Sequence, residues 1–309
     1  MSLTVLRTAD AWYLATRSGA AKIPTAAKTT AELLADRPAI TAAAADTVPV
    51  ASLDLVSPVT APCRVVAQMT NFASHVTDAG MDPRTVPLTF FRKASGSLSG
   101  PFDDVVKPPH VRLLDYEVEI GLVIGREIPV GSEITDPAEC VAGLVVTNDV
   151  SARDVQLPQT QFYEAKSYPT FTPAGPALVL LEGHELKRFA DLRLRLSVNG
   201  TVRQNAVVGE DMIYRPLEAL QALARFQRLD PGDLVLTGTP AGTALSAPPK
   251  VVEKIAALLP PALKWRLFFK GQAKNPKYLA DGDVVEAAIA TDDGALDLGT
   301  QRTIVRYRR

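Results

Sequence analysis

Short apolar runs, each closed by glycine, proline, asparagine or aspartate, recur through most of this 309-residue chain. The clearest of them read VEIGLVIG, AGLVVTND, PALVLLEG, LRLRLSVNGTVRQNA and GDLVLTGTP. Runs of this length between turn-forming residues predict β-strands, because helices need longer periodic segments. Asn199-Gly200 adds a hairpin signal, since a two-residue type I′ turn needs positive φ at both positions. We therefore expect a mixed α/β fold in which strands predominate.

The N-terminal part of the chain differs in composition from the rest, being rich in alanine and threonine. Within TTAELLADRP, Thr29 and Glu32 have the spacing of a capping box, and Pro38 is expected to stop the helix. We expect a small N-terminal lobe over residues 1–58 and a main domain over residues 59–309.

Two helices are expected inside the strand-rich part. RPLEALQALARF carries Pro216 in its first turn and apolar residues on one face, which is typical of an amphipathic helix. A second helix is expected at Val251–Leu259, ended by Pro260 and Pro261. It lies in a less regular segment, residues 244–277, which we expect either near the mouth of a site or at a subunit contact.

Charge and cysteine content exclude several classes of partner. The net charge of −1 and the pI near 6.3 provide no electrostatic footprint for nucleic acid or for an anionic membrane. No stretch approaches the roughly twenty apolar residues of a membrane span. Cys63 and Cys140 have neither metal-ligand spacing nor the pattern of a disulfide framework. We expect a cytoplasmic protein that binds neither nucleic acid nor membrane.

A pair of acidic residues on an apolar run carries the strongest chemical signal. In LDYEVEIGLVIG, Glu117 and Glu119 must share one face of a strand, while Val118 points to the other. Adjacent buried carboxylates repel each other unless a cation or a shared proton compensates them. Asp149 ends another apolar run and could meet the pair within one sheet. Three oxygen ligands without histidine or cysteine favour Mg²⁺, Mn²⁺ or Ca²⁺ over zinc. The alternative is a solvated strand face with an ordinary turn at Asp149.

Only three histidines are present, so a mechanism that needs an imidazole has few choices. His75 and Asp78 stand three residues apart in QMTNFASHVTDAG, where a helix would place the carboxylate beside the ring. Such a pair predicts a general base that works near neutral pH. The alternative is an exposed histidine with an acidic neighbour. His110 and His184 lie in probable loops, and for both we favour a structural role.

Three further residues are candidates for substrate contacts. Lys166 lies between aromatic residues and a Pro/Gly loop, where its charge could stabilise a substrate oxyanion. Gln156 could orient a substrate oxygen, and Thr239 ends a strand where its hydroxyl and backbone could meet a carboxylate.

Seven motifs occur in one order along the chain: NFASH, LDYEVEIGLVIG, TNDVSARDVQ, AKSYPTFTPAGP, VNGTVRQ, LTGTPAG and YLADGDVVEAAI. Over about residues 60 to 309 this set resembles the fumarylacetoacetate hydrolase family. The resemblance implies a barrel-like fold of mixed strands, a homodimer, and a Mg²⁺ or Mn²⁺ site whose ligands match Glu117, Glu119 and Asp149. It also implies catalysis on small oxo acids, which the metal holds while it stabilises their enolate.

The resemblance assigns roles residue by residue. His75 matches the family's histidine, Lys166 the lysine before serine, Gln156 the glutamine after S-A-R-D, and Thr239 the threonine of T-G-T-P. The acid three residues after the histidine is often glutamate in relatives, but here it is Asp78, which is one methylene shorter. The segment 244–277 is longer than the link that many relatives have.

Three functions remain open on the sequence. The first is hydrolysis or lyase cleavage of a C–C bond in a small 2-oxo or 2,4-dioxo acid. The second is isomerisation or decarboxylation of aromatic ring-cleavage products, of the 2-hydroxyhepta-2,4-diene-1,7-dioate type, or of oxaloacetate. The third is a catalytically silent metal-binding scaffold with the same fold.

Overall fold

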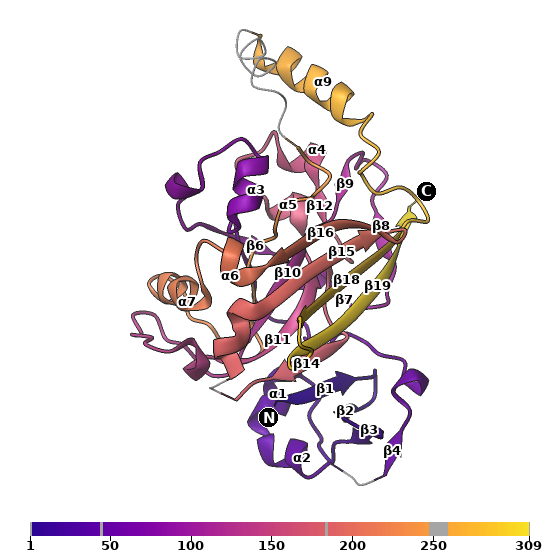
Figure 1. The fold of residues 1–309 in the computed structure, drawn as a ribbon, viewed down its shortest axis with the longest axis vertical. Coiled ribbons are helices and arrows are strands. Elements are labelled where there is room, and N and C mark those ends of the chain that lie inside the picture. Colours follow the sequence, from indigo (N-terminus) through magenta and orange to yellow (C-terminus); the bar gives the residue numbers. More distant parts are fainter. Residues whose placement is uncertain (1, 44–45, 183–184, 247–258, 309) are drawn as a thin grey trace.

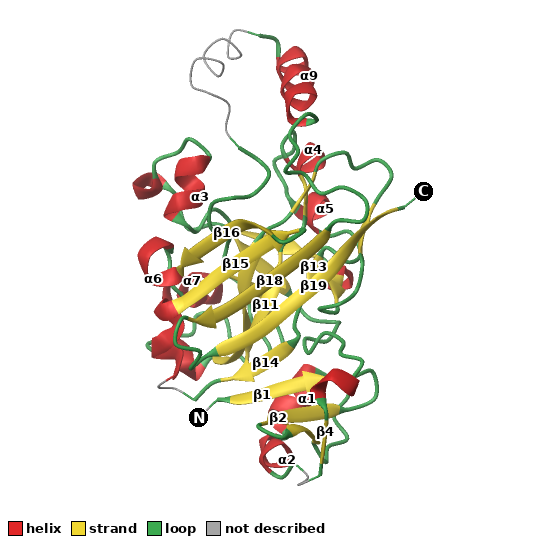
Figure 2. Ribbon diagram, turned by 45° about the vertical axis from the view of Figure 1, so that its right-hand side comes forward, coloured by secondary structure: helices red, strands yellow, loops and turns green. Residues whose placement is uncertain are grey.

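The described strands form two large sheets and two short strand pairs, and most helices lie at the ends of the sheets (Figures 1 and 2). This computed structural model describes all residues except 1, 44–45, 183–184, 247–258 and 309. The expected mixed fold with predominant strands is confirmed. The expected barrel-like arrangement takes the form of two sheets packed face to face, and no strand pairing among the described residues closes either sheet.

The larger sheet has ten strands and holds the residues of the candidate metal site. In spatial order the strands are β4 (Thr47–Val48), β3 (Gly19–Lys22), β2 (Trp12–Thr16), β1 (Leu3–Arg7), β14 (Ala177–Leu180), β11 (Val141–Asn148), β10 (Val118–Ile124), β17 (Leu234–Leu236), β5 (Val65–Gln68) and β6 (Phe90–Lys93). Neighbouring strands are antiparallel except β17 and β5, which run parallel.

The smaller sheet covers one face of the larger one. Its strands are β16 (Thr201–Val207), β15 (Leu192–Val198), β18 (Val284–Thr291), β19 (Asp297–Tyr307) and β8 (Val105–Lys107). The expected hairpin is confirmed, because Asn199 and Gly200 join β15 to β16 with φ of 51° and 76°. Apolar side chains of β10, β11, β15 and β18 form the main core between the sheets. Short pairs β9 (Leu114–Asp115) with β12 (Ser151–Ala152) and β7 (Leu98–Ser99) with β13 (Thr172–Pro173) complete the strands.

The N-terminal strands continue the ten-stranded sheet, because β1 pairs with β14. Two helices, α1 (Thr30–Ala35) and α2 (Arg37–Thr41), pack with them into a second apolar cluster on the other face of the sheet. The Thr29–Glu32 capping box is present as expected. The expectation that Pro38 stops this helix is wrong, because α1 already ends at Ala35. Pro38 lies in the first turn of α2, where a proline loses no helical hydrogen bond.

The remaining helices gather at the ends of the strands: α3 (Ala73–Asp78), α4 (Arg153–Gln156), α5 (Tyr163–Lys166), α6 (Val208–Asp211), α7 (Pro216–Ala224) and α9 (Pro261–Gln272). The amphipathic helix expected after Arg215 is confirmed as α7. Residues 251–258 of the helix expected before Pro260 lie outside the described residues. Pro260 is the N-cap of α9 and Pro261 is its first residue. That the two prolines end a preceding helix stays a prediction.

Both views show α9 standing beyond α4 and α5, at the end of the molecule opposite the N-terminal strands (Figures 1 and 2). α3 lies at this same end. Both cysteines are free thiols. Across the described residues, no helix combines the length and the apolar character that crossing a membrane requires.

Candidate active site

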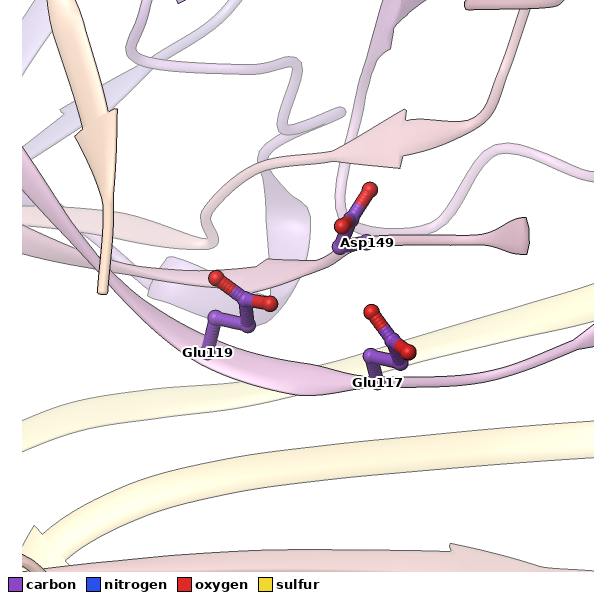
Figure 3. Close-up of side chains that lie close together, drawn as sticks. All are labelled: Glu117, Glu119 and Asp149. Carbon is purple, nitrogen blue, oxygen red and sulfur yellow. The ribbon is translucent and has the colours of Figure 1, made fainter. Parts of the chain in front are cut away.

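Three carboxylates from two neighbouring strands meet at one end of the ten-stranded sheet (Figure 3). Glu119 lies in β10, Glu117 immediately precedes that strand, and Asp149 immediately follows β11. Because β10 and β11 are antiparallel and Val118 pairs with Asn148, the end of one strand lies beside the start of the other. One oxygen from each carboxylate lies within 4.8 Å of the other two, and all three residues are buried. The structure thus brings together the three acids that the strand argument selected.

Three buried cations surround two of these carboxylates. Lys166 Nζ donates to Glu117 Oε2 at 2.6 Å and to Asp149 Oδ2 at 2.5 Å. Lys93 Nζ donates to the other oxygen of Asp149, and Arg153 Nη2 donates to the other oxygen of Glu117. A carboxylate oxygen has two lone pairs, so each of these oxygens can accept its hydrogen bond and still ligate a metal.

Glu119 is the carboxylate of the triad without a cation of its own. Among the described residues no salt bridge reaches it, and the backbone N–H of Gly238 donates to its Oε2 at 2.7 Å. Burial, followed by the charges of Asp149 and Glu117, raises the pKa of Glu119 well above its ordinary value. Burial also opposes ionisation of Glu117, but the charges of Arg153 and Lys166 outweigh it and lower that pKa to about 2. Glu119 therefore lacks a cationic hydrogen-bond partner among the described residues.

The donor set fits a hard divalent cation. Its atoms are carboxylate oxygens only, and the acid without a partner would gain a counter-charge from the ion. Arg153 also holds Asp115, with Nε donating to Oδ2 at 2.8 Å, and that second ion pair fixes the guanidinium beside Glu117. Such outer contacts orient metal-ligating carboxylates.

His75 lies in α3 and lines the same cavity as Glu117 and Glu119. Burial lowers the pKa of its imidazole, while the charge of Glu117 opposes that shift. Its Nδ1 is buried and has no hydrogen-bond partner among the described residues. Asp78 shares the helix at the predicted spacing, but its side chain is exposed and provides no bond to this atom. The role of Asp78 as partner of the ring stays a prediction.

The other three candidate residues also line this cavity, and each is partly engaged by the protein. Lys166 has three N–H donors and uses two of them on carboxylates, so one is left. Gln156 accepts from Arg153 Nη1 at 2.8 Å through its Oε1, which leaves its amide N–H groups as donors. The hydroxyl of Thr239 donates to the carbonyl of Val118 at 2.9 Å, so donating to a substrate would require it to exchange partners.

A network at the start of α3 fixes the helix that carries His75. Asp211 accepts from the backbone N–H of Ser74 at 2.6 Å and from its hydroxyl. The N–H of Ala241, in the TGTPAG loop, donates to that hydroxyl oxygen at 3.1 Å. α3 is thereby attached both to α6 and to the loop that contacts Glu119 through Gly238.

One cavity of about 1230 Å³ adjoins this site. Its floor holds Glu117, Glu119, Arg153 and Lys166, and α3 borders it with His75. Its outer wall includes aromatic residues of α9. His110, by contrast, does not line the cavity, and its Nε2 bonds to the hydroxyl of Tyr168 at 2.7 Å. His184 lies outside the described residues.

Comparison with known proteins shows the family of this chain. Residues 64–306 match the model of the fumarylacetoacetate (FAA) hydrolase C-terminal family. The chain belongs to the fumarylacetoacetate hydrolase family. It is 34% identical to the mitochondrial oxaloacetate tautomerase Fahd2a of Rattus norvegicus over 214 residues, which cover 67% of this chain and 65% of that protein.

Two other relatives match over more of their length. A 2,4-didehydro-3-deoxy-L-rhamnonate hydrolase of Sphingomonas sp. (strain SKA58) is 35% identical over 270 residues, covering 84% of this chain and 81% of that protein. The crystal structure of a probable 2-hydroxyhepta-2,4-diene-1,7-dioate isomerase from Mycobacterium abscessus superposes with a TM-score of 0.75 at 29% identity, covering 100% of both chains. Members of this fumarylacetoacetate hydrolase family thus include proteins named for different reactions.

Several residues of the site escaped the sequence argument. Lys93, Asp115 and Arg153 complete the buried ion pairs, yet each comes from a different segment, and their contacts depend on tertiary packing. One signal was present for Lys93, because it shares a strand face with Phe91, two residues earlier in an apolar run. Asp211 had no such signal, since it lies far from Ser74 in sequence.

Proposed function

We propose that this protein is a divalent-metal-dependent enzyme that cleaves a C–C bond beside a carbonyl in a 2-oxo or 2,4-dioxo acid. The observation that carries the proposal is the buried carboxylate of Glu119. It lies beside the carboxylates of Glu117 and Asp149, and among the described residues no cation pairs with it. We propose Mg²⁺ there, with Mn²⁺ or Ca²⁺ as alternatives. When bound, the ion would hold the oxo acid and stabilise negative charge that develops on its oxygen.

The residues of the chain supply the proton transfer in this proposal. His75 takes a proton from a water molecule, and the hydroxide adds to the C4 carbonyl carbon of a 2,4-dioxo acid. When the bond between C3 and C4 breaks, its electron pair passes to C3, and His75 returns the proton there. The products are a carboxylic acid and a 2-oxo acid. The burial of His75, which lowers its pKa, supports this role because it favours the neutral ring.

Three residues would position the substrate. The remaining N–H of Lys166 would donate to the oxyanion, and the amide N–H groups of Gln156 would hold a substrate oxygen. Thr239 would contact the substrate carboxylate through its backbone or, after exchanging partners, through its hydroxyl.

Tautomerisation or isomerisation of an oxo acid is the second candidate. The names of the rat relative and of the Mycobacterium abscessus structure favour it. The same base would then move a proton between carbon atoms or between carbon and oxygen, and no bond between carbons would break. Decarboxylation of oxaloacetate would use the same developing enolate.

A substrate panel tests the proposal. Metal-loaded protein is incubated with acylpyruvates, fumarylacetoacetate and oxaloacetate, and products are separated by chromatography. We expect turnover that EDTA abolishes and that Glu119→Gln reduces. A catalytically silent scaffold would bind the ion but turn over none of them, and His75→Ala would then change no rate.

Assembly and compartment complete the proposal. We propose a homodimer, which light scattering on the eluting protein checks directly. The two free cysteines support a reduced compartment, and we propose the cytoplasm. Localisation of a tagged full-length chain in its own cell tests this.

A further inference from the structure

The cavity extends well beyond the charged floor. Its volume of about 1230 Å³ exceeds the 300–1,000 Å³ of ordinary ligand pockets, whereas a chelating oxo acid headgroup needs only the floor. Beyond the carboxylates the lining becomes apolar and aromatic, with Val86, Phe91, Phe162, Trp265 and Phe268 among its residues. The outer part of the cavity therefore has a chemistry of its own.

α9 provides one wall of this outer part. Lys264, Trp265, Phe268 and Gln272 line the cavity and follow the three- and four-residue spacing of one helix face. None of the described side chains of α9 is buried, so the helix does not turn its rings into the protein core. Trp265 and Phe268 contact each other edge to face, with ring centroids 5.9 Å apart.

A second aromatic pair lies closer to the floor. Phe91 and Phe162 contact each other edge to face at 5.7 Å, and the ammonium of Lys166 lies 5.2 Å from the centroid of the Phe91 ring. Phe91 comes from β6, and Phe162 immediately precedes α5. The cavity lining thus contains aromatic rings both beside Lys166 and on α9.

Cations for a second substrate carboxylate are scarce in this lining. Among the described lining residues, the permanently cationic side chains are Arg153, Lys166 and Lys264. Arg153 and Lys166 already hold carboxylates of the protein. Lys264 is exposed on α9, where a surface charge is weakly felt. The outer part of the cavity therefore complements a neutral apolar group better than an anionic one.

We propose that the outer part of the cavity binds an apolar group, an aryl ring or an alkyl chain, at the end of the oxo acid that points away from the carboxylates. The substrate class is then an acylpyruvate with an aryl or alkyl acyl group and no second carboxylate. This inference rests on the proposed function, because the headgroup must be held at the floor for the tail to reach α9.

Unreactive ligands test the subsite by equilibrium binding. Oxamate supplies the headgroup alone, N-butyloxamate and N-phenyloxamate add an apolar tail, and N-(2-carboxyethyl)oxamate adds a second carboxylate. Trp265 can report binding, because the chain has two tryptophans and the other, Trp12, is buried in the N-terminal sheet. A Trp12→Phe protein loaded with Mg²⁺ then yields a signal from the cavity wall.

We expect affinity to rise by about threefold per methylene and by about tenfold or more for the phenyl tail, as burial of apolar surface predicts. Phe268→Ala should remove most of that gain without changing the affinity for oxamate. Phe162→Ala lies outside α9, so it should also remove most of that gain even if Phe268→Ala disturbs α9. The control Phe226→Ala, at a 63% exposed phenylalanine outside the cavity lining, should change neither affinity.

The outcomes separate the subsite from the proposed function. If oxamate binds and the apolar tails add no affinity, the subsite is refuted while the proposed function stands. Preference for the carboxyethyl ligand, abolished by Lys264→Ala, would also overturn the subsite, because the outer part would then bind an anion. If the two phenylalanine variants change the oligomeric state and leave tail affinity intact, the aromatic wall is a subunit contact instead. If neither oxamate nor oxalate binds in the presence of Mg²⁺, the proposed function itself is wrong.

Discussion

Replacement of Glu119 by glutamine should have opposite effects on the metal-free and metal-loaded protein. If Glu119 were ionised in the metal-free protein, its oxygen would repel each neighbouring carboxylate oxygen within 4.8 Å by roughly 3 kcal/mol at an effective dielectric constant of about 20. Burial and this repulsion raise the pKa of Glu119. Glutamine cannot ionise, so its neutral amide avoids this repulsion and resembles the protonated acid in charge. We therefore expect Glu119→Gln to leave the metal-free unfolding free energy unchanged or to raise it by about 1 kcal/mol.

With divalent metal bound, the wild type should become more stable to unfolding than Glu119→Gln. Metal at one hundred times its dissociation constant stabilises the wild type by about 2.7 kcal/mol. If loss of the carboxylate weakens affinity about a hundredfold, the same metal concentration stabilises the variant by only about 0.4 kcal/mol. For a chain of this size the melting temperature should then rise by about 5 °C or more in the wild type and by about 1 °C in the variant.

Thermal unfolding by differential scanning fluorimetry measures both effects, after EDTA treatment and after a titration with Mn²⁺ or Mg²⁺. The matched control is Glu127→Gln, which changes an exposed acid next to the distant end of β10. It should retain the full metal response. The reasoning is refuted if Glu119→Gln keeps that response, or if it destabilises the metal-free protein by several kcal/mol, as the breaking of a structural ion pair would.

Lys93→Met should lower the unfolding free energy, measured by urea denaturation, by about 3 kcal/mol, because it removes the buried ammonium that holds one oxygen of Asp149. A change below about 0.5 kcal/mol would show that this ion pair does not stabilise the fold. kcat/KM should fall at acidic pH as His75 becomes protonated, because only its neutral ring accepts a proton. The pKa of this acid limb should lie below the ordinary histidine value of 6.5, because burial lowers the pKa of His75. His75→Gln should remove that limb and reduce kcat by about a hundredfold, with an unchanged dissociation constant for Mn²⁺; an unaltered pH profile would assign the base elsewhere. Asp211→Asn should lower the unfolding free energy by about 2 kcal/mol and increase amide hydrogen exchange in α3, because it weakens two hydrogen bonds from Ser74. Unchanged exchange would mean that α3 is held by other contacts.

Local and periodic features could be predicted from the sequence. Alternation along a strand placed Glu117 and Glu119 on one face, and the capping box and the Asn199-Gly200 turn formed where their residues indicated. Each of these depends on neighbours within a few positions. Pro38 shows where such reasoning fails, because a proline fits the first turn of a helix as well as the position after its end.

The electrostatic environment of the site could not be predicted from local patterns. Lys166 was expected to face a substrate oxyanion, yet its ammonium also bridges Glu117 and Asp149, which lie 49 and 17 positions away. The aromatic face of α9 was likewise hidden, since residues 244–277 gave no clear period. Long-range contacts of this kind are decided by how the sheets pack.

The most direct test of the central claim is a crystal of the protein soaked with Mn²⁺ and oxalate, measured for anomalous scattering from the metal. The account predicts one strong peak per chain, bound by oxygens of Glu117, Glu119 and Asp149, with oxalate completing the coordination on the cavity side. Absence of a peak there, or a peak that is held by other residues, would contradict the account.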